Sequence, residues 1–284
     1  MSCAMEPEVL SPADLPDLLA LCRAAHWNQT EADWRRVLAL EPELCLGIRA
    51  GGRIVSTAAA VTYSPAEGFP PLAWIGMVLT DPEHRGHGFA RRLMTRLTAT
   101  LDGRGFAVQK LDATSMGLPL YEQLGFLAEQ PIERWQRDPS RKRIQASGVV
   151  EPFRCDAALD IPAFGWDRSR LLPSLLDAPG ADAALTEGGF AMGRPGAIAA
   201  YFGPCAARSP LAAKRLANWF LARHHGEVVF WDLLPHNGEA QALARSLGFR
   251  PVRTLVRMVR RPPGVTEPPR RDEHIFAIAG FEFG

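Results

Sequence analysis

Residues 78–94 read VLTDPEHRGHGFARRLM, a glycine-rich turn between two apolar segments. The apolar run at 72–80 before the turn predicts a buried central strand. After the turn, apolar side chains recur at every fourth position, which predicts an amphipathic helix ending at Gly103: Phe89, Leu93, Leu97 and Leu101. A strand therefore enters this turn and a helix leaves it.

Three kinds of phosphate-binding loop can be compared with this turn. A Walker loop ends in Gly-Lys-Ser/Thr, which is missing, and a dinucleotide fingerprint needs a third glycine where Arg91 stands. The remaining pattern, R-x-x-G-x-A at 85–90, offers backbone N–H groups and the positive end of a helix dipole to an anion such as a pyrophosphate. The alternative is structural, with glycines that only permit the torsion angles of a tight turn.

The neighbouring segments predict a mixed α/β sheet flanked by helices. Capping boxes at 11–14 and 30–33 predict two short helices, and the segment 44–62 predicts a hairpin that turns at Gly51-Gly52. Downstream we expect a strand at 106–112, a short helix at 118–123 and a strand from Gly125-Phe126 toward Trp135.

The turn and the later segment PLYEQLGF at 119–126 together resemble the acyl-CoA-binding core of the GNAT superfamily of N-acetyltransferases, over roughly residues 5–135. The resemblance implies that Val78, Leu79 and Thr80 expose backbone groups to the pantetheine arm and the acyl carbonyl. It also implies that the turn wraps the pyrophosphate of acetyl-CoA with Arg85, Gly86, His87, Gly88, Phe89 and Ala90. Thr114 stands where many members carry an asparagine that contacts the pantetheine.

Acyl transfer to an amine needs a neutral nucleophile, a stabilised oxyanion and a proton for the leaving thiolate. A backbone N–H near residues 78–80 is expected to serve the oxyanion, and the Tyr121 phenol to protonate the sulfur. The alternative for Tyr121 is packing beneath the Leu124-Gly125-Phe126 turn. Asp112, Glu31 and Asp33 are weak candidates for a general base, since each is read more simply as a solvated carboxylate or a helix cap. No base is assigned, because a water chain would also suffice.

The length of 284 residues predicts two domains, and a repeat supports the division. Leu-Gly-Phe occurs at 124–126 and again at 247–249, and the same ungapped shift places Arg208 over Arg85. We expect a first domain at 1–138, a linker at 139–147 and a second domain at 148–284 with a final strand near 274–283.

The second half resembles the degenerate GNAT-like domain of tandem family members. In the ungapped alignment, Leu211 replaces Gly88 and Ala244 replaces Tyr121, so this half is expected to bind no CoA. Asn237 falls over Thr114 and is the one position where the second half looks more like the family.

Composition excludes several other classes of protein. Hydrophobic residues make up 47%, charged residues 22%, and the net charge is +1, which argues against a nucleic-acid-binding field. The longest near-apolar stretch, 196–207, is shorter than the roughly 20 residues of a membrane helix, and no targeting signal is found, so we expect a cytoplasmic protein. The dispersed cysteines predict no metal site: Cys3, Cys22, Cys45, Cys155 and Cys205.

The predicted function is transfer of an acetyl group from acetyl-CoA to an amine of a small molecule, peptide or protein, by direct attack in a ternary complex without a metal. The alternative is a non-catalytic acyl-CoA-binding regulatory module. The acceptor amine, the acyl-chain preference and the oligomeric state are not encoded in any pattern of the sequence.

Overall fold

The computed structural model describes every residue except 1–4, 66, 142–143, 146–150 and 153–156. Cys3, Cys155 and part of the predicted linker (142–143 and 146–147) therefore lie outside the described residues. The first half contains, in chain order, β1 (Glu8–Val9), α1 (Leu15–Ala24), α2 (Glu31–Leu40), β2 (Cys45–Ala50), β3 (Arg53–Tyr63), β4 (Leu72–Thr80), α3 (Phe89–Gly103), β5 (Val108–Ala113), α4 (Leu118–Gln123) and β6 (Leu127–Arg137).

The second half repeats much of this order. It contains β7 (Glu151–Pro152), α5 (Ala157–Phe164), α6 (Leu171–Leu175), β8 (Asp182–Thr186), β9 (Gly189–Arg194), β10 (Ala200–Ala207), α7 (Pro210–Arg223), β11 (Val229–Leu233), α8 (Gly238–Ser246), β12 (Arg250–Arg260) and β13 (Ile275–Ala277). Single 3-10 turns lie at Pro12–Asp14, Pro82–His84 and Asp272–His274.

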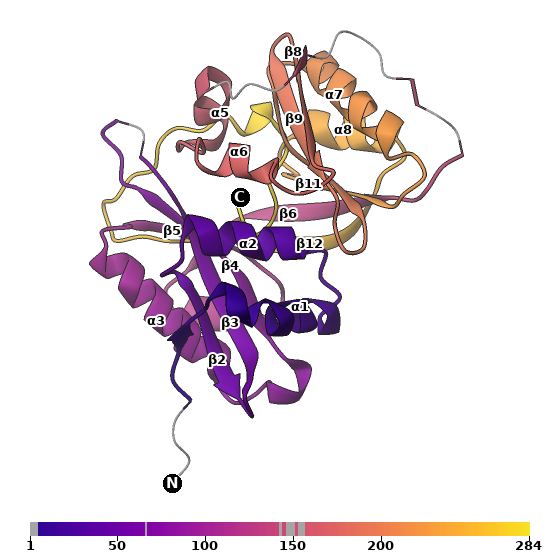
Figure 1. Cartoon of the computed structure of the whole chain (residues 1–284). Coiled ribbons are helices and arrows are strands. Elements are labelled where there is room, and N and C mark those ends of the chain that lie inside the picture. Colours follow the sequence, from indigo (N-terminus) through magenta and orange to yellow (C-terminus); the bar gives the residue numbers. More distant parts are fainter. Residues whose placement is uncertain (1–4, 66, 142–143, 146–150, 153–156) are drawn as a thin grey trace.

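The strands form one sheet in the order β1-β2-β3-β4-β5-β12-β6-β11-β10-β9-β8-β7, with β13 paired to β10. The two halves therefore exchange a strand. β12 of the second half lies between β5 and β6 of the first, while β6 pairs with β11 of the second. The two exchanged strands cross the middle of the molecule in Figure 1. The expected domains at 1–138 and 148–284 are separate along the chain, but both contribute strands to one sheet.

Local sequence signals set the element boundaries in the first half. The Ser11 N–H donates to the Asp14 carboxylate, and the Thr30 N–H donates to the Asp33 carboxylate, so both capping boxes are confirmed. The buried strand at 72–80 and the helix at 118–123 are also confirmed, with the bounds expected from the sequence.

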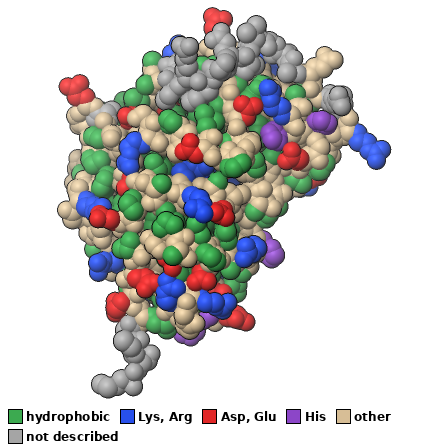
Figure 2. Space-filling model, in the orientation of Figure 1, with side chains coloured by type: hydrophobic (Ala, Val, Ile, Leu, Met, Phe, Trp, Pro, Cys, Tyr) green, Lys and Arg blue, Asp and Glu red, His purple; other side chains and the backbone are tan. Residues whose placement is uncertain are grey.

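The apolar residues divide between the two faces of the sheet. Leu93, Leu97 and Leu101 of α3 pack on one face, in the same cluster as Tyr121. The helices α1 and α2 cover the other face together with α5 and α6 of the second half, and Trp74 and Phe283 belong to that cluster. The chain ends between the halves, near the centre of Figure 1. On the face drawn in Figure 2, basic and acidic side chains are interspersed.

Candidate functional site

The connection between β4 and α3, residues 81–88, presents a row of backbone N–H groups to solvent. Gly86 and Gly88 have φ angles of 80° and 75°, and Gly88 is the N-cap of α3 without any side-chain cap. Within the part of the chain that the structure describes, the backbone N–H groups of residues 86–91 donate no hydrogen bonds. A Cβ built on either glycine meets nothing within 4 Å. These features suit an anion held by the helix N-terminus.

The other loop residues divide between solvent and core. Arg85 and His87 are exposed, and the His87 ring stacks on Phe89 at 5.7 Å between ring centroids. Phe89 is buried and anchors the first turn of α3, while Ala90 is partly buried. The loop therefore rests on a fixed helix end, and its polar groups remain accessible.

The strand β4 separates from β5 immediately beside this loop. The two strands pair only from Leu72↔Val108 to Trp74↔Lys110, and the remainder of β4 has no such pairing with β5. A bulge opposite Ala58 gives Met77 a φ of 53°. Residues 78–80 consequently lie along an opening in the sheet, and on the side away from β3 they pair with no strand in the described part of the chain.

Tyr121 lies on α4, in the apolar cluster of the α3 face, and is 8% exposed. Its ring contacts Phe126 edge-to-face, so packing against the Leu-Gly-Phe turn does occur. Gly117 makes room for the ring, because a Cβ there would lie 2.8 Å from the Tyr121 Cε2. Burial raises the pKa of Tyr121, so the phenol keeps its proton at neutral pH.

Thr114 and its counterpart Asn237 are both used to start a helix. The Thr114 Oγ1 accepts from the Gly117 N–H at 3.3 Å, ahead of α4. The Asn237 Oδ1 accepts from the Ala240 N–H at 3.0 Å, and its amide donates to the Ile275 carbonyl at 2.9 Å. Asn237, the one position where the second half looks more like the family, therefore serves as the N-cap of α8.

The three weak base candidates occupy different environments. Glu31 is exposed and pairs with Arg35. Asp33 caps α2 as expected, but it is not solvated, since it is buried beside Arg36. Asp112 is also not solvated: its two oxygens accept from Arg257 at 2.9 and 3.0 Å, and the interior of the strand exchange encloses both side chains. The sequence could not indicate this burial, because the partner lies on a distant strand.

In the described residues of the second half, the connection from β10 to α7 differs from the 81–88 loop. α7 follows β10 after residues 208–209 alone, and its N-cap Ser209 accepts from the Ala212 N–H through its own side chain. The ungapped shift therefore fails here. The N-cap equivalent to Gly88 is Ser209 rather than Leu211, because the connection is shorter and the segment at 81–86 has no counterpart.

Two family models match the chain, one in each half. Both are described as acetyltransferase (GNAT) domains, at residues 7–128 and 157–277. The chain consists of two tandem GNAT domains. The uncharacterized N-acetyltransferase YitH of Bacillus subtilis (strain 168) is 29% identical over 167 residues, which cover 57% of this chain and 56% of that protein.

Solved structures share the tandem GNAT fold. A Pyrococcus horikoshii protein assigned provisionally as an acetyltransferase has a TM-score of 0.83 at 20% identity, covering 100% of this chain and 97% of its own. A GCN5-related N-acetyltransferase from Sphaerobacter thermophilus has a TM-score of 0.62 at 17% identity, covering 94% and 96%. At these identities the likeness concerns the fold.

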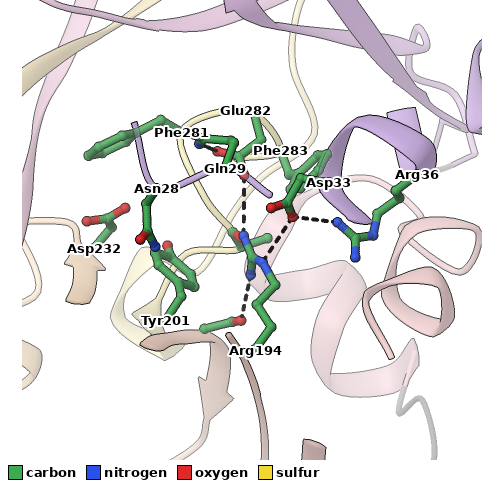
Figure 3. Close-up of polar contacts among 12 residues, drawn as sticks. Asn28, Gln29, Asp33, Arg36, Arg194, Tyr201, Asp232, Phe281, Glu282 and Phe283 are labelled. Atoms are coloured by element: carbon green, nitrogen blue, oxygen red, sulfur yellow. Dashed lines mark hydrogen bonds and ion pairs between the residues drawn. The ribbon is translucent and has the colours of Figure 1, made fainter. Parts of the chain in front are cut away.

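One polar site between the two GNAT domains has no sequence signal. A recess of about 10 Å³, named here the seam recess, is lined by Gln29, Asp33, Arg134, Arg194, Tyr201 and Glu282. Figure 3 shows Arg194 between the carboxylates of Asp33 and Glu282. These residues come from distant parts of the chain, so no local pattern joins them.

The described residues show neither a membrane-spanning helix nor a cluster of metal ligands. None of the helices there combines the length and apolar content that a bilayer span requires. No group of three or more His, Cys, Asp or Glu side chains is arranged there to hold a metal ion. Cys22, Cys45 and Cys205 are free and buried.

Proposed function

We propose that the first GNAT domain transfers an acetyl group from acetyl-CoA to an amine, on a small molecule or on a peptide or protein, by direct attack in a ternary complex. The observation that carries the proposal is the open row of N–H groups at 86–91, which lies at the end of the strand that separates from β5. The helix end can bind the pyrophosphate of CoA, and the opening in the sheet beside it can receive the pantetheine arm.

Each residue of the site receives a role in this proposal. Arg85, Gly86, His87, Gly88, Phe89 and Ala90 wrap the pyrophosphate, and residues 78–80 bind the pantetheine and the acyl oxygen through their backbone. Tyr121 donates a proton to the leaving sulfur, for which its phenol is available in the protonated form because burial raises its pKa. Thr114, which lies before α4 and accepts from the Gly117 N–H, is assigned a contact with the pantetheine arm.

The second GNAT domain binds no CoA in this proposal. Its β10–α7 connection is short, and the helix end is closed by the Ser209 side chain. At the position of Tyr121 the α8 helix carries Ala244, which has no proton to donate.

Replacement of Tyr121 by phenylalanine tests the catalytic part of the proposal. The Tyr121→Phe variant keeps the ring that packs on Phe126 and removes only the hydroxyl. We expect turnover, measured as release of CoA thiol with primary amines, to fall about 10²–10⁴-fold while acetyl-CoA affinity changes little. Near-normal turnover would return Tyr121 to a packing role. Binding of acetyl-CoA without any turnover of the wild type would favour the regulatory module instead.

A further inference from the structure

The C-terminal tail, residues 278–284, covers the face of β4 opposite Tyr121. The Trp74 Nε1 donates to the Phe281 carbonyl at 3.0 Å, and the Tyr63 hydroxyl donates to the Phe283 carbonyl at 2.7 Å. A Cβ on Gly76 would lie 2.7 Å from the Glu282 Cα. The tail of the second GNAT domain therefore lies directly against the residue that precedes the Met77 bulge.

Glu282 turns its side chain from this contact into the seam recess. One carboxylate oxygen accepts from Gln29 Nε2 at 3.1 Å, and the other from Arg194 Nη2 at 3.3 Å. Arg194 is itself fixed by the Ala279 carbonyl at 2.8 Å and lies 3.5 Å from Asp33. The carboxylate is thus held in one orientation by groups from both domains (Figure 3).

The loop between α1 and α2 is fixed to the second domain at the same place. The Asn28 Oδ1 accepts from the N–H groups of Ile198 and Ala199, both at 2.9 Å. The Ala197 N–H donates to the Asn28 carbonyl at 2.9 Å. Exposed Pro195 also lines the recess, which therefore borders solvent on that side.

The geometry points to binding of CoA and of the acceptor amine on opposite faces of β4. The anion loop and Tyr121 belong to the α3 face, so CoA bound there leaves the opposite face for the acceptor. We propose that Glu282 is the proton acceptor for the acceptor amine, and that the seam recess receives the ammonium head of a primary amine. This assignment rests on the proposed acetyl transfer and adds a group supplied by the second domain.

The size of the recess selects the class of acceptor. A cavity of about 10 Å³ accommodates one water-sized group, and an –NH₃⁺ head is of that size. An N-methylated amine is larger and loses one hydrogen-bond donor. Primary amines are therefore the expected acceptors.

The protons and bonds balance in this scheme. The incoming R–NH₃⁺ gives one proton to the Glu282 carboxylate, and its nitrogen then forms the C–N bond as the C–S bond breaks. The thiolate takes the Tyr121 proton, and the second nitrogen proton restores Tyr121 through solvent. The amide and the CoA thiol leave, and the proton on Glu282 returns to solvent.

The surroundings of Glu282 make it a stronger proton acceptor than an exposed carboxylate. Burial raises the pKa of Glu282 although Arg194 opposes the shift, whereas Arg194 and Arg36 hold the pKa of Asp33 low against its own burial. These opposite shifts, together with the position of Glu282 directly against Gly76 of β4, favour Glu282 over Asp33 as the proton acceptor. The charged and titratable groups that interact with it come from several elements: Cys22 (α1), Asp33 and Arg36 (α2), Tyr63 (β3), Arg134 (β6), Arg194 (β9) and Tyr201 (β10).

The test uses the full chain, acetyl-CoA and n-propylamine, with N-methylpropylamine as the secondary amine. Glu282→Gln should lower kcat/KM for n-propylamine about 10²–10⁴-fold at neutral pH and leave acetyl-CoA affinity unchanged. The deficit should shrink as the pH approaches the pKa of the amine, because free amine needs no base. The matched control is Glu273→Gln, an exposed glutamate before β13, which should behave as wild type.

A second variant covers the case in which Glu282→Gln does not fold. Gln29→Leu removes one donor to the carboxylate without removing a charge, so the rising limb of the pH profile should move to higher pH. A loss by the same factor at every pH, or profiles that match wild type in both variants, would overturn the assignment. Equal turnover of the secondary amine would overturn the size argument.

Failure of the proposed function gives a different result. A wild-type chain that does not bind acetyl-CoA refutes the acetyl transfer and this assignment together. Binding without thiol release by any primary amine supports a binding module and overturns the assignment. Turnover that is indifferent to Glu282 refutes the assignment alone.

Discussion

Replacement of Arg257 by methionine should destabilise the whole molecule, because this side chain joins the exchanged strand β12 to β5. Its guanidinium makes two hydrogen bonds to Asp112 and lies 4.4 Å from the centre of the Trp74 ring. The Arg257 and Asp112 side chains are 2% and 0% exposed. Removing one partner of such a pair leaves a buried carboxylate without compensation, at a cost of about 3–5 kcal/mol.

The size and pH dependence of the effect can both be measured. For a chain of this length the loss corresponds to a fall in Tm of roughly 10 °C. Burial already raises the pKa of Asp112 against the opposing effect of Arg257, and without Arg257 that pKa rises further. The deficit in unfolding free energy should therefore shrink as the pH falls, because Asp112 can then be buried in its neutral form.

Two controls separate this ion pair from general damage to β12. Arg253→Met removes an exposed arginine of the same strand and should change the unfolding free energy by no more than about 0.5 kcal/mol. The double variant Asp112→Leu/Arg257→Met removes both charges and should recover much of the loss. If Arg257→Met proves as mild as Arg253→Met in urea unfolding, β12 does not lie against β5 as described and the reasoning fails.

Three further results are expected. Gly88→Leu should abolish acetyl-CoA binding in calorimetry. The control Gly105→Leu should retain binding, because Gly105 has a similar positive φ and equally open space but lies at the other end of α3. Unchanged affinity in a folded Gly88 variant would refute the pyrophosphate assignment. Titration of the full chain should give one acetyl-CoA site per chain, and two sites would show that the second domain binds as well. Burial opposes ionisation of Glu129, but Lys110 and Arg270 lower its pKa to about 2. About 3 kcal/mol of stability that is present above pH 4.5 should therefore be lost as the pH falls toward 2. In urea unfolding, Glu129→Gln should not show this loss of stability between pH 4.5 and pH 2.

The sequence predicted those features that depend on neighbours along the chain. Residues a few positions apart determine the capping boxes, the hairpin at Gly51-Gly52 and the strand–turn–helix around Gly88. The resemblance to GNAT enzymes, confirmed by the family models, added the fold of both halves. Roles of individual residues in the site remain predictions, which the variants above test.

The features that the sequence did not reveal depend on distant partners. The strand exchange leaves no local trace, because β6 and β12 have the same alternating character whichever neighbour they pair with. Glu282 and Arg194 meet only in the folded chain, and each alone reads as an ordinary charged residue. The ungapped alignment is wrong at α7, because the Leu-Gly-Phe repeat fixes it only near β6 and β12 and the shorter β10–α7 connection lies earlier in the chain.

Two buried ion pairs make each half depend on a strand that the other half supplies. Arg257 of β12 holds Asp112 of β5, and Arg134 of β6 holds Asp232 of β11 at 2.7 and 2.8 Å, so each exchanged strand carries an arginine to the other half. Arg134 and Arg257 are separated by the same shift of 123 that relates the Leu-Gly-Phe repeats. Deleting the second half would remove Arg257 and leave Asp112 on a strand edge without its partner. The second domain therefore contributes strands to the sheet on which the proposed site of the first domain lies, whether or not it binds an anion itself.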